Sequence, residues 1–112
     1  MRVRQLLLTL AIISISCAGS SNWAFDKPPS TFVVTQRAVI DGKKPILLVV
    51  HDKDGDWQFL ATEFSQIDRV VELPFDEVVA LDSTVVQVAK LNRGWKAVRQ
   101  GRESPWEFSL YK

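Results

Sequence analysis

The chain has 112 residues, of which 46% are hydrophobic and 24% charged, and its formal net charge is +1. That length fits one domain, and the composition is that of a globular protein rather than a disordered or collagen-like one. A single cysteine and a single histidine exclude an internal disulfide, a multi-cysteine zinc site and a metal site built on paired histidines. The near-zero net charge argues against a general nucleic-acid-binding surface.

The first residues have the pattern of a bacterial export signal. Arg2 and Arg4 form a short basic segment, residues 6–16 are uncharged and mostly apolar, and small residues follow from Cys17 onward. This order of positive, apolar and small segments is that of a signal peptide. The apolar segment is shorter than the roughly 20 residues that span a bilayer. We therefore predict a signal peptide over residues 1–19 and an exported protein, located in the periplasm or anchored by a lipid in the cell envelope.

Cys17 decides how this signal ends. The small residue Ser16 precedes it and Ala-Gly-Ser-Ser-Asn follows it, which resembles a lipoprotein signal whose cysteine becomes the lipid-bearing N-terminus. Ser14 departs from that pattern, because leucine is the usual residue three positions before the cysteine. Cleavage after Ala18 or Ser20 is the alternative. Cys17 is thus a lipidation candidate, and a lipid on it is the only membrane contact that we expect.

Residues 20–30 have the composition of an extended tether. Pro28 and Pro29 resist helix formation, and most of the remaining residues are small or polar. We therefore expect the folded domain over residues 31–112.

The first half of this domain carries strand patterns. Residues 32–40 are rich in β-branched and aromatic residues and predict a strand that ends at the turn residues Asp41 and Gly42. The apolar run 46–50 predicts a strand buried on both faces. An Asp-Gly turn follows it, and residues 57–61 return as the second strand of a hairpin.

The second half mixes helix and strand. Residues 70–73 predict a short strand, and Pro74 is well placed to begin a helix. Asp82 and Ser83 are expected to end that helix or to cap a second short one.

Two further strands are predicted near the C-terminal end, over residues 95–99 and 106–110. The second of them alternates, with Trp106, Phe108 and Leu110 on one face. The sequence therefore predicts an α+β fold, preceded by a cleaved signal peptide. In it, a mainly antiparallel sheet has one or two short helices packed on one face.

The acidic turn is the first candidate for chemistry. Asp52, Asp54 and Asp56 stand at alternate positions, which partly matches the oxygen-ligand spacing of a calcium loop, and Glu63 follows at position 12. Trp57 stands where such a loop needs glycine, and no predicted helix pair flanks it. The alternative is a solvated hairpin tip whose aspartates favour turn geometry. We expect no metal and no cofactor.

His51 is the only histidine and hence the only imidazole base that the chain offers. Asp52 would not readily orient it, because adjacent residues on a strand point to opposite faces. No serine stands in a nucleophile-elbow context and no glycine-rich phosphate loop is present. We therefore predict no catalytic residue.

Charge is distributed unevenly along the domain. Residues 51–82 hold nine acidic and two basic side chains, whereas residues 83–112 hold six basic and two acidic ones. Basic residues near tryptophans are typical of single-strand nucleic-acid sites and of protein interfaces, and export argues against nucleic acid. The candidate residues for binding a protein partner are Trp57, Trp95, Arg99 and Trp106. The alternative is that the tryptophans belong to the core.

Several short stretches resemble a known family. They are residues 34–42, residues 49–59, the pair Gly94-Trp95 and residues 105–107. These stretches resemble a family of small bacterial domains of unknown function, some members of which are similar to toxin-immunity proteins. One departure is at Leu60, where the family often continues with Gly-Asp or Gly-Glu. The resemblance implies the fold rather than an activity, because the family offers no established catalytic residues.

Two functions follow from these patterns. The first is a non-catalytic protein-binding module of the cell envelope, which the resemblance would make immunity-like, with an envelope-acting toxin as its partner. The alternative is a small-ligand-binding protein or a minor hydrolase that uses His51 and the Asp52–Asp56 turn. A purely structural role in the envelope is the remaining possibility.

Overall fold

The structure is a computed structural model that describes residues 22–61 and 70–112. The predicted signal peptide, with the lipidation candidate Cys17, lies outside the described residues, and so does Glu63. In the part of the chain that is described, no helix is both long enough and apolar enough to cross a membrane.

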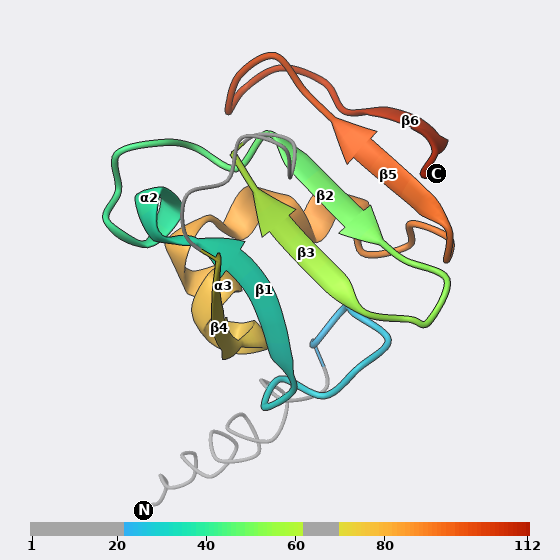
Figure 1. Cartoon of the computed structure of the whole chain (residues 1–112), viewed down its shortest axis with the longest axis horizontal. Coiled ribbons are helices and arrows are strands. Elements are labelled where there is room, and N and C mark those ends of the chain that lie inside the picture. Colours follow the sequence, from blue (N-terminus) through green and yellow to red (C-terminus); the bar gives the residue numbers. More distant parts are fainter. Residues whose placement is uncertain (1–21, 62–69) are drawn as a thin grey trace, which may run out of the picture.

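A six-stranded mixed sheet forms the centre of the domain (Figure 1). Its strands are β1 (Phe32–Gln36), β2 (Leu48–His51), β3 (Trp57–Leu60), β4 (Val70–Pro74), β5 (Trp95–Val98) and β6 (Glu107–Leu110). They lie side by side in the order β4-β1-β3-β2-β5-β6. β1 and β3 run parallel, and the other neighbouring pairs are antiparallel. The α+β class is confirmed, with a sheet that is mixed because β1 joins the hairpin beside β3.

The predicted hairpin is present as β2 and β3. His51 is paired with Trp57 at its closed end and Leu48 with Leu60 at its open end. All four residues of β2 are buried, as expected for a central strand with neighbours on both sides.

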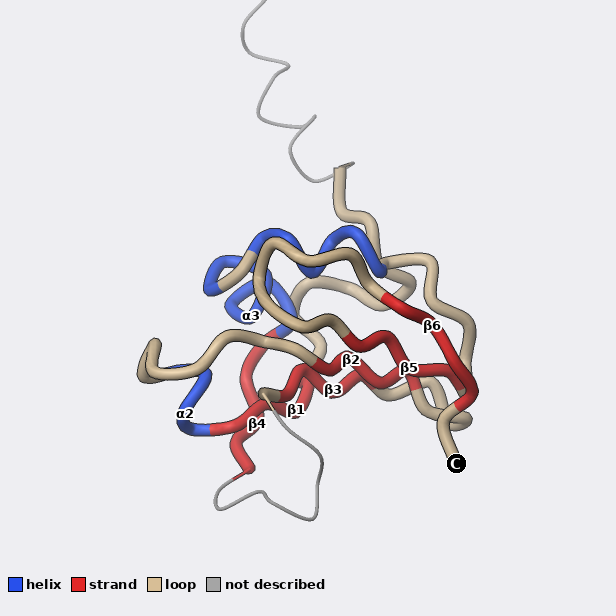
Figure 2. The backbone as a smooth tube through the Cα atoms, turned by 90° about the horizontal axis from the view of Figure 1, so that it is seen from above, coloured by secondary structure: helices blue, strands red, loops and turns tan. Residues whose placement is uncertain are grey.

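In the described residues, three short helices accompany the sheet: α2 (Arg37–Ile40), α3 (Phe75–Leu81) and the 3-10 helix η3 (Ser83–Val88). Helices α3 and η3 cover one face of the sheet (Figure 2). Helix α3 begins directly after Pro74, as the sequence predicts. The Asp82 side chain accepts a hydrogen bond from the Thr84 N–H at 3.0 Å and so caps η3.

The predicted continuation of the first strand to residue 40 is wrong, because residues 37–40 form helix α2. Gly42 has a φ of +75°, a left-handed conformation that commonly ends a helix. Backbone N–H groups of Asp41 and Gly42 donate to the carbonyls of Arg37 and Val39 at 2.9 and 3.1 Å. This local closure outweighs the β preference of Val39, whose side chain is buried in the core.

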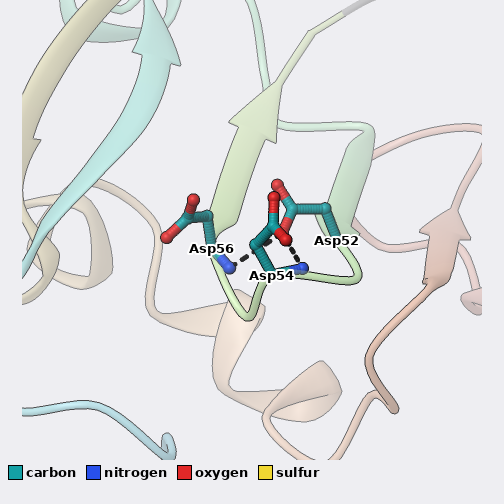
Figure 3. Close-up of side chains that lie close together, drawn as sticks. All are labelled: Asp52, Asp54 and Asp56. Carbon is teal, nitrogen blue, oxygen red and sulfur yellow. Dashed lines mark hydrogen bonds between the residues drawn. The ribbon is translucent and has the colours of Figure 1, made fainter.

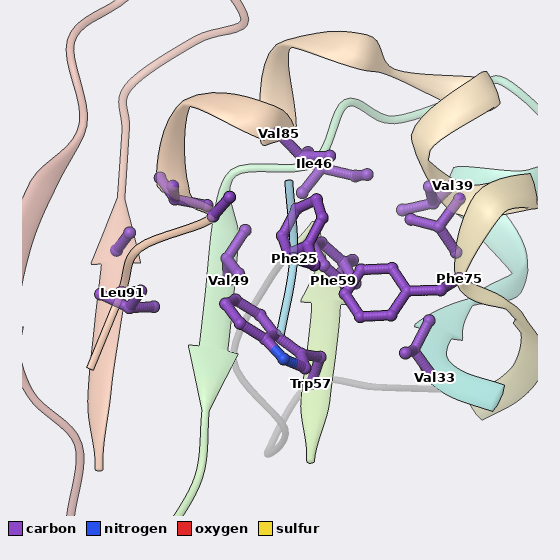
Figure 4. Close-up of a cluster of buried hydrophobic side chains, with 14 residues drawn as sticks. Phe25, Val33, Val39, Ile46, Val49, Trp57, Phe59, Phe75, Val85 and Leu91 are labelled. Atoms are coloured by element: carbon purple, nitrogen blue, oxygen red, sulfur yellow. The ribbon is translucent and has the colours of Figure 1, made fainter. Parts of the chain in front are cut away.

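The main core lies between the sheet and the two helices, and aromatic rings fill its centre (Figure 4). Phe25 contacts three of these rings, with centroid distances of 4.4 Å to Phe75, 5.0 Å to Trp57 and 6.2 Å to Phe59. Only 6% of Phe25 is exposed. A smaller cluster of Leu48, Val50 and Leu60 occupies the opposite face of the sheet.

Residues 23–26 are therefore part of the folded domain, whereas the sequence predicts a tether over residues 20–30. Two aromatic residues next to a pair of prolines show neither helical nor strand periodicity, so the sequence offers no pattern from which their burial follows. Trp23 also packs against Phe75, with a centroid distance of 5.2 Å.

We expect Phe25→Ala to lower the free energy of unfolding by about 3–5 kcal/mol, because it removes a buried ring from the centre of the core. Urea denaturation of the purified protein measures this change. Phe32→Ala is the matched control, because Phe32 is 65% exposed and its loss should change stability by less than about 0.5 kcal/mol. Equal stability of the two variants would show that residues 23–26 do not belong to the core.

Candidate functional site

An apolar hollow of about 260 Å³ lies between η3, the following loop and strands β5 and β6. Val88, Leu91, Trp95 and Phe108 line it, together with the exposed residues Gln87, Lys90 and Asn92. Phe108 is 53% exposed and Leu110, two residues further along β6, is 59% exposed. We call this hollow, with the exposed side chains of Phe108 and Leu110, the edge groove.

Strand β6 forms one edge of the sheet. Its residues Glu107 and Phe108 are paired with Val98 and Ala97 of β5, and no described strand lies on its other side. All four residues of β6 are exposed. Side chains of a strand alternate between faces, so Phe108 and Leu110 point to the same face of the sheet.

A second hollow, of about 560 Å³, lies at the end of β6 and is rich in cations. Lys53, Arg93 and Lys112 line it, together with Gly94, Leu110 and Tyr111. The Arg93 guanidinium lies over Gly55, where a Cβ atom would meet its Cζ at 3.0 Å. Gly55 has a φ of +91°, so the absence of a side chain serves both the turn and the close approach of this arginine.

Arg99 is buried, with only 3% of it exposed, and its guanidinium makes four hydrogen bonds inside the domain. Nε donates to the Ile46 carbonyl at 2.9 Å, and one terminal nitrogen donates to Thr84 Oγ1 at 2.9 Å and to the Arg102 carbonyl at 2.8 Å. The other terminal nitrogen donates to Asp82 Oδ2 at 2.8 Å. Arg99 therefore holds segments of the chain together, and little of its hydrogen-bonding capacity is left for a partner.

Asp82 is the counter-ion of this arginine. Burial alone would raise the pKa of Asp82, but hydrogen bonds from Thr84 and the positive charges of Arg102 and Arg99 outweigh it and hold that pKa below its ordinary value of 3.8. Asp82 is thus ionised in the folded protein at neutral pH, as a buried arginine requires.

The three candidate tryptophans lie in different surroundings. Trp57 is buried in the core, and its Nε1 donates to Asp26 Oδ1 at 2.9 Å. Trp106 is half-buried, with the Arg99 guanidinium 4.1 Å from its ring centroid, and its Nε1 donates to Gln87 Oε1 at 3.0 Å. Trp95 is half-buried and lines the edge groove. The structure brings Arg99 and Trp106 together, and of the tryptophans only Trp95 faces the hollow.

His51 is buried and stacks on Trp57, with ring centroids 4.0 Å apart and an interplanar angle of 14°. Its Nδ1 lies 2.7 Å from the Leu91 carbonyl oxygen, which can only accept, so Nδ1 carries a proton. Nε2 is buried without a hydrogen bond and lies 3.4 Å from Asp26 Oδ2. Both nitrogens thus lie next to protein atoms.

The acidic turn closes on itself (Figure 3). Asp52 Oδ1 accepts the backbone N–H of Asp54 at 2.9 Å and that of Asp56 at 3.0 Å. Carboxylate oxygens of the three aspartates lie within 4.8 Å of one another. The spacing that resembles a calcium loop is thus the spacing of an aspartate-capped turn, and turn geometry explains it.

Phe108, Leu110 and Asp26 are not among the candidate site residues that the sequence indicates. The alternation of residues 106–110 places Phe108 and Leu110 on one face, but alternation is the same for a buried and an exposed face. Asp26 stands in a segment without periodicity, and its contacts depend on how that segment packs.

The comparison with known protein families, with curated proteins and with solved structures finds no match to this chain. The resemblance to immunity-like bacterial domains therefore stays a prediction.

We expect Asp82→Asn to lower the free energy of unfolding by about 3–5 kcal/mol at neutral pH, because it leaves Arg99 buried without a counter-ion while asparagine still caps η3. The folded state lowers the pKa of Asp82, so the ionised carboxylate stabilises the folded protein at pH values above the ordinary pKa of an aspartate. This stabilisation is lost as the pH falls through the pKa that Asp82 has in the folded protein. The difference between the wild type and Asp82→Asn should therefore shrink below about pH 3.8. Urea denaturation from pH 7 to pH 2 measures it. Glu77→Gln, on the exposed side of α3, is the control, and a difference independent of pH would contradict the assignment.

We also expect the neutral imidazole of His51 to be the Nδ1–H tautomer, because the Leu91 carbonyl accepts from Nδ1. Nitrogen-15 chemical shifts of the ring, recorded at alkaline pH, distinguish the two tautomers. Because the chain has one histidine, the assignment of these signals is unambiguous. A predominant Nε2–H form would show that the Leu91 contact is absent.

Proposed function

We propose that this chain is a non-catalytic protein-binding module, exported to the cell envelope, whose binding surface is the edge groove. The observation that carries the proposal is the exposure of Phe108 and Leu110 on one face of the edge strand β6, next to an apolar hollow. Large apolar side chains gathered beside a hollow on a monomer are typical of a protein-binding surface. An unpaired strand edge adds backbone groups that a partner can use.

The export part of the proposal comes from the sequence. The basic, apolar and small segments of residues 1–19 support export, and Cys17 supports a lipid anchor as one of two ways in which the signal can end. An immunity-like role against an envelope toxin is one form that such a binding module can take.

The alternative function, ligand binding or hydrolysis at His51 and the acidic turn, has weaker support. A general base needs a nitrogen within reach of a substrate proton, and both nitrogens of His51 face protein atoms. One oxygen of the Asp52 carboxylate, Oδ1, accepts two backbone N–H groups of its own turn. A hollow of about 500 Å³ does border His51 and Asp26, yet His51 Nε2 is buried.

We expect a photo-reactive phenylalanine analogue in place of Phe108 to form one adduct of defined mass with another protein when cells that make the protein are irradiated. The same analogue in place of Phe32 is the matched control, because Phe32 is also an exposed phenylalanine but lies on the opposite face, at the other end of the sheet. Denaturing gel electrophoresis followed by mass spectrometry identifies the adducts. No adduct from position 108, or the same adduct from both positions, would contradict the edge groove as the binding surface.

A further inference from the structure

We infer that the edge groove binds an extended segment of the partner protein that pairs with β6 as an added strand and carries acidic residues at its end. The inference rests on the proposed function and specifies the conformation and charge of what is bound. Three observations carry it: the backbone pattern of β6, the apolar face beside it and the cations at its end.

The backbone of β6 offers hydrogen-bonding groups to a new strand. The Tyr111 N–H donates to the Gly94 carbonyl at 2.8 Å, so Tyr111 directs its N–H toward the β5 side. In an antiparallel ladder every second residue points its N–H and C=O to the same neighbour. Ser109 therefore also faces β5, where it is paired with Lys96, and the N–H and C=O groups of Phe108 and Leu110 face the open edge. These are the groups that an added strand uses.

The apolar face of β6 determines which side chains an added strand should carry. A strand added beside β6 directs every second side chain to the face of Phe108 and Leu110. Those side chains would cover the exposed parts of both residues and reach toward the hollow that Val88 and Leu91 line. Alternating apolar residues are therefore favoured in the bound segment.

The cations near β6 determine which charge is favoured in the bound segment. Lys53, Arg93 and Lys112 line the hollow at the Leu110 end of β6, and Lys90 borders the edge groove. No ion pair joins any of these four cations to an acidic group among the residues that the structure describes. Charge complementarity therefore favours acidic residues next to the apolar ones and disfavours basic residues there.

The first test uses a fluorescently labelled ten-residue peptide with alternating valine and threonine in its middle and two glutamates at each end. Fluorescence anisotropy with the purified protein should show saturable binding. A peptide with lysines in place of the four glutamates should bind at least about tenfold more weakly, because it places like charges beside Arg93 and Lys112. Equal binding of the two peptides would overturn the charge assignment.

N-methylated peptides test the strand pairing itself. Methyl groups on the valine nitrogens block one edge of an extended peptide, and methyl groups on the threonine nitrogens block the other. When the valines face the edge groove, only one of these edges pairs with β6. One methylated peptide should therefore lose binding while the other retains it. Equal effects of both would indicate apolar docking without strand pairing and would overturn the inference.

Variants of the protein give an independent test. Leu110→Pro removes an N–H that faces the open edge, which an edge strand tolerates, and should weaken peptide binding at least about tenfold. Leu110→Ala keeps that N–H and should weaken binding less. Lys112→Gln should weaken binding about threefold or more, whereas Lys44→Gln, which removes the same charge from the loop after α2, should not change it. Circular dichroism checks that each variant is folded. Where a variant does not fold, the methylated peptides test strand pairing on the wild-type protein instead.

The outcomes separate this inference from the proposed function. An adduct from position 108 without binding of any peptide would overturn the added strand and leave the protein-binding module in place. Absence of both the adduct and peptide binding would overturn both the added strand and the proposed function. A concentration-dependent dimer that Leu110→Pro abolishes, without peptide binding, would make a second copy of this chain the occupant of the edge and would overturn the acidic segment.

Discussion

The last third of the molecule is arranged around one buried cation, the guanidinium of Arg99. A buried charge without partners costs several kcal/mol, so the surrounding chain must supply acceptors. They come from separate segments: the Ile46 carbonyl before β2, Asp82 and Thr84 at the start of η3, and the Arg102 carbonyl. These bonds hold η3 against the sheet and fold the chain back after β5, so that Trp106 covers the guanidinium. Strand β6 begins at the next residue, and its position as an exposed edge follows from the same contacts.

A second set of contacts surrounds His51 and Asp26. Phe25 completes the aromatic core, and the neighbouring Asp26 accepts from Trp57 Nε1 and lies beside His51 Nε2. The other nitrogen of His51 is bound to the Leu91 carbonyl, which fixes the loop after η3. The only histidine thus joins the N-terminal segment, the hairpin and this loop. The same loop then borders the edge groove through Leu91, so the contacts of His51 help to position the groove of the proposed binding surface.

The sequence predicts the elements better than it predicts which surfaces are exposed. The hairpin, helix α3 after Pro74 and the cap at Asp82 follow from local chemistry and are present. The sequence misses helix α2, because a left-handed Gly42 outweighs strand preference there, and it misses the burial of Phe25, because that segment has no periodicity. Basic and aromatic residues of the sequence gather around β5 and β6, and the proposed binding surface lies there as well. Which of them remain accessible depends on partners distant in sequence, and these partners bury Arg99 while leaving Phe108 exposed.

The two edges of the sheet differ in how they resist pairing with other chains. At the β4 edge, Pro74 lacks an N–H and Glu72 is exposed, both of which discourage an added strand. Strand β6 also has an exposed glutamate, Glu107, but it contains neither proline nor lysine and it exposes Phe108 and Leu110 on one face. Natural sheets that work as monomers protect an edge of this kind, since it otherwise promotes association. An edge left open beside a hollow and a group of cations therefore supports the proposal that a partner covers it, and the cations favour an acidic segment of that partner.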